Sequence, residues 1–156
     1  MYWEEHIDRL KKSYSPAEFS VPFSDWVEIM KKIENRFIKK VNSNYHFSNW
    51  KNNIRKEIEV ATINAKDLES SLMFLTDSTN HWVIIPNSQA PTASHYVYDC
   101  NLGSLIALVR LHKASFFIVE KKYGWFTFFC VTEDNNSVTI LKSGESITPF
   151  DKLANG

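Results

Sequence analysis

Four residues whose side chains bind metals or act as nucleophiles lie within eighteen positions of one another: His95, Asp99, Cys100 and His112. Imidazole, carboxylate and thiolate groups are zinc ligands, and a Cys–His pair can form an activated nucleophile. A zinc site usually needs two close ligand pairs, whereas the one short pair here, Asp99 and Cys100, would point to opposite faces of a strand. We therefore expect structural roles for all four residues, with a hydrolase or metal enzyme around residues 95–112 as an alternative. We expect no catalytic residue, no metal and no cofactor.

Other chemical motifs are weaker still. Phosphate-binding loops and nucleophile elbows need closely spaced glycines, and the four glycines stand far apart at positions 103, 124, 144 and 156. The segment Tyr123–Phe129 has the alternating aromatic residues of an RNA-stacking strand, but its basic residue, Lys122, stands one position too early. A core strand is the better interpretation of this segment.

The charges are balanced overall and segregated along the chain. Eighteen basic and eighteen acidic residues give a formal net charge of zero, which argues against a dedicated binder of nucleic acid or anionic membranes. A surplus of basic residues nevertheless lies between positions 31 and 57, where Glu34 and Glu57 are the acids. The basic residues there are Lys31, Lys32, Arg36, Lys39, Lys40, Lys51, Arg55 and Lys56. This segment is either a solvated helix face or a patch that meets an acidic protein or a nucleic acid.

The apolar spacing indicates which of these cations face solvent. Trp26, Ile29, Met30, Ile33 and Phe37 recur at helical intervals after Ser24, so the pattern predicts a helix over Asp25–Lys40 with one buried stripe. Its other side carries Lys32, Arg36, Lys39 and Lys40.

A tryptophan follows this helix. Trp50 has polar neighbours and is expected to be a partly exposed anchor beside the cations, although packing under the preceding helix is nearly as compatible with its position. The predicted binding residues are therefore Lys32, Arg36, Lys39, Lys40 and Trp50.

Helices dominate the first half of the chain and strands the second. Apolar periodicity predicts helices at 2–13, 15–18, 25–40, 64–75 and 101–112, and another beginning after Ser48 that contains Trp50, Ile54 and Ile58. Strands are predicted at 59–63, 81–85, 95–98, 116–120, 125–132 and 138–142. This order favours a single α+β domain over residues 1–156, with a C-terminal antiparallel sheet packed against N-terminal helices. The strand at 125–132 is apolar on both sides, so either helices cover both faces or one aromatic face is left for a partner.

The compartment is indicated by what the chain lacks. Its first residues are acidic where a signal peptide is basic, and its longest aliphatic run, Leu105–Val109, is too short for a membrane span. The two cysteines show no disulfide or CxxC spacing. We expect a cytoplasmic protein with free thiols and no membrane contact.

The stretch Tyr96–Leu141 resembles a known group of proteins. It reads YVYDCNLGSLIALV, then FFIVEKKYGWFTF, then an acidic turn and a last strand, and it is similar to small bacterial α+β proteins that include SUKH-like immunity proteins of polymorphic toxin systems. A Cys-Glu-Asn-His-His run of that group is replaced here by Cys130-Val131-Thr132-Glu133-Asp134, so a site built on the histidine pair does not carry over. The resemblance implies a protein-binding role and no catalytic residues.

These observations together favour a non-enzymatic protein-binding module, such as an immunity-type inhibitor or adaptor. Its partner is expected to be another protein, for example an acidic toxin domain, and self-association into a homo-oligomer stays open. A nucleic-acid-associated protein that uses residues 31–56 is the alternative from another class.

Overall fold

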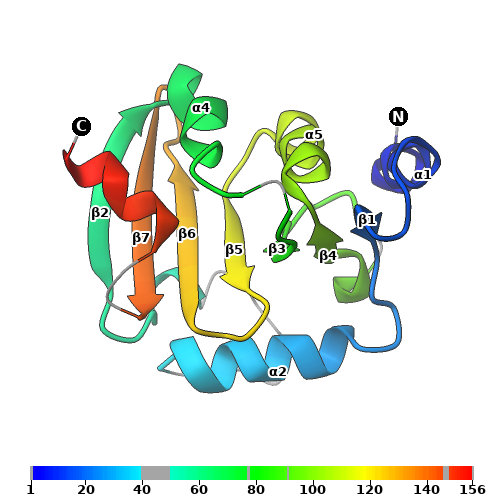
Figure 1. Ribbon diagram of the computed structural model, residues 1–156, viewed down its shortest axis with the longest axis horizontal. Coiled ribbons are helices and arrows are strands. Elements are labelled where there is room, and N and C mark those ends of the chain that lie inside the picture. The colour runs from blue at the N-terminus through cyan, green and yellow to red at the C-terminus, as the bar shows by residue number, and fades with distance from the viewer. Residues whose placement is uncertain (1, 40–49, 77, 91, 146–147, 156) are drawn as a thin grey trace.

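The computed structural model describes residues 2–39, 50–76, 78–90, 92–145 and 148–155, and these form a seven-stranded antiparallel sheet with helices on both faces (Figure 1). The α+β class predicted from the sequence is confirmed. The strands are β1 (Phe19–Ser20), β2 (Ile58–Asn64), β3 (His81–Ile84), β4 (Val97–Cys100), β5 (Phe116–Glu120), β6 (Trp125–Val131) and β7 (Ser137–Gly144). The α-helices are α1 (Trp3–Ser13), α2 (Trp26–Phe37), α4 (Leu68–Leu72) and α5 (Leu102–His112), and the 3₁₀ segments are η1 (Ala65–Asp67), η2 (Ala93–His95) and η3 (Pro149–Asn155).

The sheet grows from a meander of consecutive strands. Its order is β1-β4-β3-β5-β6-β7-β2, so the predicted hairpins of β5, β6 and β7 lie side by side as expected. Their register places Phe117 opposite Phe128 and Phe128 opposite Leu141. The order also pairs β2 with β7, more than seventy residues later in the chain, which local sequence patterns do not indicate.

Alternation along the strands creates two apolar faces. On one, called here the α5 face, Phe116 stacks on Phe129 at 4.8 Å between ring centres, and α1, α4, α5 and η3 add their apolar residues. On the other, called the α2 face, Phe117 stacks on Phe128 at 4.5 Å beneath α2. Both faces are therefore covered, which answers the question raised by a strand that is apolar on both sides.

Helix α2 is anchored through its apolar stripe. Ile33 and Phe37 are fully buried as predicted, and the Phe37 ring stacks on Phe126 of the sheet at 5.4 Å, while Trp26 is only half-buried. Gly144 makes this close approach feasible, because its φ of +98° lies in the left-handed region and a Cβ there would clash with the Phe37 ring.

The expected helices around position 50 need correction. Helix α2 ends at Phe37 because Ile38 is extended and forms a β-bridge with Ile54, so the predicted end at Lys40, a residue outside the described ranges, is too late. The helix expected after Ser48 ends at Lys51 and does not reach Ile58, which begins β2. The three apolar residues at helical spacing therefore belong to different structures: Trp50 to a helix end, Ile54 to a β-bridge and Ile58 to a strand.

Other boundaries also differ from the prediction. The helix expected at 64–75 is the 3₁₀ turn η1 followed by α4, which ends at Leu72. One half of the predicted capping box at Ser15–Glu18 is present, with the Ser15 N–H donating to a Glu18 carboxylate oxygen at 2.8 Å, but only one turn follows before β1 begins. The strand expected at 95–98 is shifted to Val97–Cys100.

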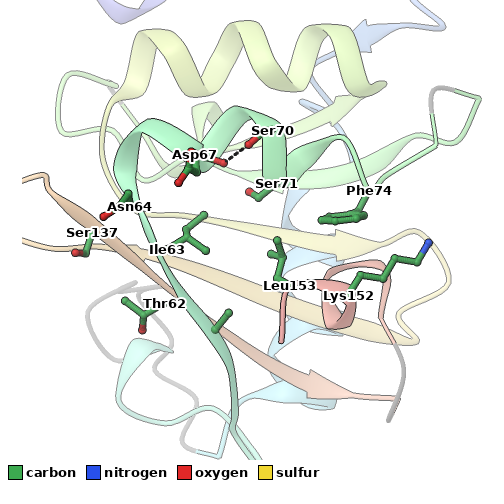
Figure 2. Close-up of a pocket in the computed structure, with 11 residues that line it drawn as sticks. Thr62, Ile63, Asn64, Asp67, Ser70, Ser71, Phe74, Ser137, Lys152 and Leu153 are labelled. Carbon is green, nitrogen blue, oxygen red and sulfur yellow. Dashed lines mark hydrogen bonds between the residues drawn. The ribbon is translucent and has the colours of Figure 1, made fainter. Parts of the chain in front are cut away.

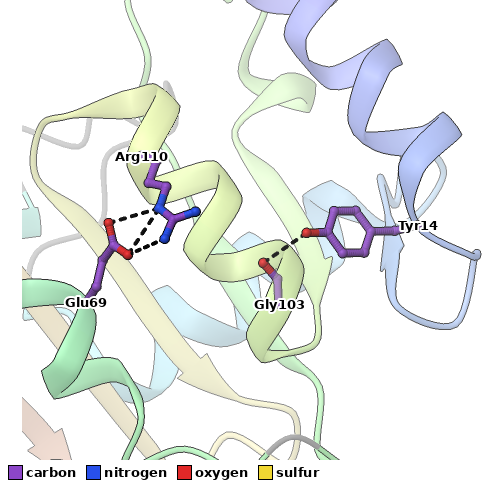
Figure 3. Close-up of polar contacts among 4 residues, drawn as sticks. All are labelled: Tyr14, Glu69, Gly103 and Arg110. Atoms are coloured by element: carbon purple, nitrogen blue, oxygen red, sulfur yellow. Dashed lines mark hydrogen bonds and ion pairs between the residues drawn. The ribbon is translucent and has the colours of Figure 1, made fainter.

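Helix α5 is held by polar contacts at its outer surface. Asn101 caps its start by accepting from the Ser104 N–H at 3.0 Å. Figure 3 shows Arg110 paired with Glu69 of α4, at 2.7 Å for the shortest contact, and the Tyr14 hydroxyl donating to the Gly103 carbonyl at 3.3 Å. The Arg110–Glu69 pair is exposed, so it contributes little to the stability of the fold.

Candidate binding surface

Two segments of the basic stretch meet at the end of α2. The Lys39 N–H donates to the Asn53 carbonyl and the Arg55 N–H to the Phe37 carbonyl, both at 2.7 Å. The Arg55 guanidinium Nε also donates to the Ile38 carbonyl at 2.9 Å. These bonds bring the cations of residues 55–56 beside those of α2 and restrict the Arg55 side chain before any partner binds.

The turn between β5 and β6 adds a third segment. Arg36 Nε donates to the Tyr123 carbonyl at 3.3 Å, and Lys32 Nζ lies 5.7 Å from the centre of the Tyr123 ring, within the range of a cation–π interaction. Tyr123 has a φ of +58°, so the chain turns sharply here. Burial raises the pKa of the Tyr123 hydroxyl. The neighbouring Lys122 is exposed on the same turn.

Together these segments form a surface that we call the basic face. The predicted Lys32, Arg36 and Lys39 are exposed on it, whereas Lys40 lies outside the described residues. The exposed acids that adjoin it include Glu28 of α2, which lies near Tyr123, together with Glu57 and Glu145; they are fewer than its cations, so the surface keeps a positive excess. Such an excess attracts acidic partners and accelerates their association. The basic face consists of Lys31, Lys32, Arg36, Lys39, Arg55, Lys56 and Lys122.

The prediction that Trp50 is a partly exposed anchor is wrong. Its side chain is 1% exposed and packs edge-on against Phe117, with the ring centres 5.2 Å apart. Its indole N–H donates to a Glu34 carboxylate oxygen of α2 at 3.0 Å. The alternative that Trp50 packs under the preceding helix is confirmed, because an apolar sheet face below α2 needs a large side chain to fill it.

Glu34 is a buried acid that sequence analysis did not single out. Its side chain is 1% exposed, and among the described residues one of its carboxylate oxygens has no hydrogen-bond partner. Burial raises the pKa of Glu34, and the hydrogen bond from Trp50 only partly offsets this. A sequence signal existed, because Glu34 follows Met30 by four positions and therefore falls on the apolar stripe of α2.

Replacing Glu34 by glutamine should raise the melting temperature at pH 7. A raised pKa means that the folded state favours protonated Glu34, so its favourable contribution is present below the ordinary value of 4.5 and is lost as the pH rises through the folded pKa. Glutamine stays neutral and still accepts from Trp50. Thermal unfolding between pH 4.5 and pH 7 should show the gain shrinking toward acid pH. The exposed Glu28→Gln on the same helix is the control, and an equal gain from it would contradict this prediction.

Half-buried aromatic residues lie beside the basic face and are better anchor candidates than Trp50. Trp82 of β3 packs at the margin of the α2-face core, and Lys121 Nζ lies 3.8 Å from its ring centre. Lys121 also pairs with Asp99 at 2.6 Å. Trp26 and Tyr123 are half-buried in the same core cluster. The alternation in 81–85 places Trp82 on the face opposite Val83. The sequence does not show that the elements covering that face leave Trp82 half-buried.

The four residues with potential chemistry have separate structural surroundings. Asp99 is held by Lys121, while Cys100 is buried on the α5 face and its thiol pKa is raised by burial. The His95 ring packs edge to face with the Phe23 ring, with the ring centres 5.3 Å apart. His112 Nε2 lies 2.8 Å from the Ser115 carbonyl oxygen. Within the described ranges, no three His, Cys, Asp or Glu side chains are grouped so that they could hold a metal ion. No helix in the same ranges has the length and apolar character to cross a membrane.

Comparison with known proteins places the chain in a family. No curated protein and no solved structure matches it. A family model described as a family of unknown function (DUF6756) matches residues 7–146. The matched range contains all seven strands of the sheet described above and every residue of the basic face. Because the match extends over most of its length, the chain belongs to the DUF6756 family.

Proposed function

We propose that this chain is a non-enzymatic cytoplasmic module that binds an acidic surface of another protein through its basic face, as an immunity-type inhibitor or adaptor. The observation that carries the proposal is the assembly of seven exposed cations from three separate segments on a chain with no net charge. Two of the cations, Arg36 and Arg55, are held by hydrogen bonds to main-chain carbonyls. A side chain that is already restricted loses less conformational entropy on binding.

The surroundings of the basic face favour a protein over a nucleic acid. Protein interfaces combine desolvated aromatic anchors with a polar rim, and half-buried Trp82, Trp26 and Tyr123 lie beside the cations. Nucleic-acid binders usually carry a basic excess over the whole domain, whereas this chain is neutral. The resemblance of Tyr96–Leu141 to SUKH-like immunity proteins adds support for the immunity-type role.

Charge reversal on α2 tests the proposal. The probe is a fluorescent 15-residue peptide of alternating Glu and Tyr, compared with a single-stranded oligothymidylate of similar charge. We expect wild-type protein to bind the peptide more tightly than the oligonucleotide, with affinity falling as salt rises. Lys32→Glu with Arg36→Glu should weaken peptide binding at least about tenfold and flatten the salt dependence, because two attractive charges become repulsive. The melting temperature should change little, since both side chains are exposed.

A matched reversal on the α5 face serves as the control. Lys12→Glu with Lys66→Glu changes the net charge equally at exposed positions away from the basic face and should leave binding nearly unchanged. Equal losses in both double variants would show that only net charge matters. Tighter binding of the oligonucleotide, or no binding of the peptide at low salt, would contradict the proposal.

The immunity-type role has its own test in cells. If a gene adjoining this one encodes a toxic domain, co-expression of the wild-type chain should relieve growth arrest by that domain. The Lys32→Glu, Arg36→Glu variant should fail to relieve it, whereas the α5-face control should still do so. Relief by both variants would exclude the basic face as the inhibitory surface.

A further inference from the structure

The two edges of the sheet differ strongly. β1, at one edge, contains two residues, whereas β2, at the other edge, contains seven. β2 pairs with β7 on one side, and on its other side it has no strand partner within the described part of the chain. An edge strand presents unpaired N–H and C=O groups at every second residue, which can hydrogen-bond to another extended chain.

β2 has few of the features that usually block such pairing. It contains no Lys, Arg or Pro, and its only charged residue is Glu59. An irregularity in the register lies between Glu59 and Ala61, after which the strand is regular from Ala61 to Asn64. The Thr62 side chain is exposed on the α2 side of the sheet, where its hydroxyl lies 3.1 Å from that of Thr139 on β7. The section from Ala61 to Asn64 is therefore suited to strand pairing.

Exposed apolar groups accompany this edge. Three of the five exposed large hydrophobic side chains of the described chain are Ile58 at the start of β2 and Met73 and Phe74 after α4, with exposed fractions of 54%, 59% and 37%. A groove of about 620 Å³ runs between β2, α4 and η3, with Ile63 on the strand side and Phe74 across from it (Figure 2). Phe74 lines this groove and Met73 directly precedes Phe74, whereas Ile58 lies at the opposite end of β2. Exposed apolar residues at a groove mark a contact site more often than scattered ones do.

We propose that two copies of this chain pair through their β2 edges, antiparallel, about a twofold axis that passes through Thr62. Such an axis is perpendicular to the sheet, so it maps the α5 face of one copy onto the α5 face of the other. Paired residues must then lie on the same face, which places Thr62 opposite Thr62 of the second copy and Ala61 opposite its Ile63. The pairing joins two seven-stranded sheets into one continuous sheet.

The side chains in this register are compatible with themselves. Two threonines face each other at the axis, which is a favourable cross-strand pair. A small Ala61 meets a large Ile63 on the side of the groove, so their volumes complement each other. Glu59 does not face its own symmetry mate, so the register contains no opposed like charges.

A second copy is the occupant that the charge and the edges favour. The chain has no net charge, so two copies do not repel each other as a whole. β1 is too short to receive β2, which disfavours open head-to-tail chains and leaves the closed β2–β2 pair.

The oligomeric state tests the inference directly. Sedimentation and light scattering from about 1 to about 200 μM should show a monomer–dimer equilibrium for wild-type protein. Thr62→Lys should shift it to monomer, with at least a tenfold rise in the dissociation constant, because two lysines would meet at the axis. Thr139→Lys is the matched control: it removes the same hydroxyl contact and adds the same charge one strand further in, and it should remain dimeric.

A cross-linking measurement decides the register even if Thr62→Lys fails to fold. In a Cys130→Ser background, Thr62→Cys should form a disulfide-linked dimer on mild oxidation, because paired Cα atoms about 4.5–5.5 Å apart suit a disulfide. Thr139→Cys should not. A wild-type protein that stays monomeric throughout overturns the inference and leaves β2 for a strand of another protein. A dimer that survives Thr62→Lys, or that cross-links equally through Thr139→Cys, also overturns it.

Discussion

Truncating Phe37 to alanine is expected to lower the free energy of unfolding by about 3–5 kcal/mol, the usual cost of removing a fully buried phenylalanine ring. Phe37 is 0% exposed, stacks on Phe126 and lies against Gly144, so it joins the end of α2 to the centre of the sheet. The cavity cannot close readily, because the left-handed backbone at Gly144 and the bridge from Ile38 to Ile54 hold the surrounding chain in place. Urea unfolding followed by circular dichroism measures the change.

Phe23 provides the matched control for this truncation. Its ring is 46% exposed and lies near the His95 ring and the Lys11 ammonium, so Phe23→Ala should cost less than about 1 kcal/mol. Truncated Phe37 should also weaken peptide binding at the basic face, since Arg36 and Arg55 are positioned by the same end of α2. A cost at Phe37 no larger than that at Phe23 would contradict the packing of α2 described above.

Replacing His81 by glutamine should remove a large part of the acid sensitivity of the fold. His81 of β3 is 6% exposed beside the Trp125 ring, and burial lowers its pKa from 6.5 to about 4. Its contribution to stability is therefore complete above pH 6.5 and is lost as the pH falls to about 4. A shift of this size corresponds to about 3 kcal/mol, because each pKa unit is worth 1.36 kcal/mol.

The measurement is urea unfolding of wild-type and His81→Gln protein at several pH values from 7 to 4. The difference between them should change by about 3 kcal/mol across this range, with wild-type losing more. His95→Gln, at a half-buried histidine near the end of the sheet, is the control and should not produce this change. If the free energies of unfolding of wild-type and His81→Gln protein changed in parallel with pH, the pKa of His81 would be the same in the folded and unfolded states, which would contradict this prediction.

Local patterns predicted most of the regular structure. The β5–β6–β7 meander follows from compact β-branched and aromatic runs separated by short turns, and α5 follows from its apolar spacing and the Asn101 cap. The interval around Trp50 failed because residues at helical spacing also fit a helix end, a bridge and a strand. Only the hydrogen bonds between 37–39 and 53–55 decide among these, and they join residues that are distant in sequence.

The binding surface was predictable only in part. The apolar stripe of α2 determined that Lys32, Arg36 and Lys39 face solvent, because a helix with one buried side leaves its other side exposed. The contribution of Lys122 and Tyr123 depends on the packing of α2 across the β5–β6 turn, which no local pattern encodes. Trp50 was placed wrongly because its polar neighbours in sequence are not its neighbours in space.

The sequence by itself determined the α+β class, the segments of most helices and strands, and the segregation of charge, because these depend on residue type and on spacing within a few residues. Tertiary structure alone decided which strand ends the sheet and that Trp50 is buried. Each of these depends on contacts between residues far apart in the chain, where the burial of an apolar surface from one element selects the partner from another.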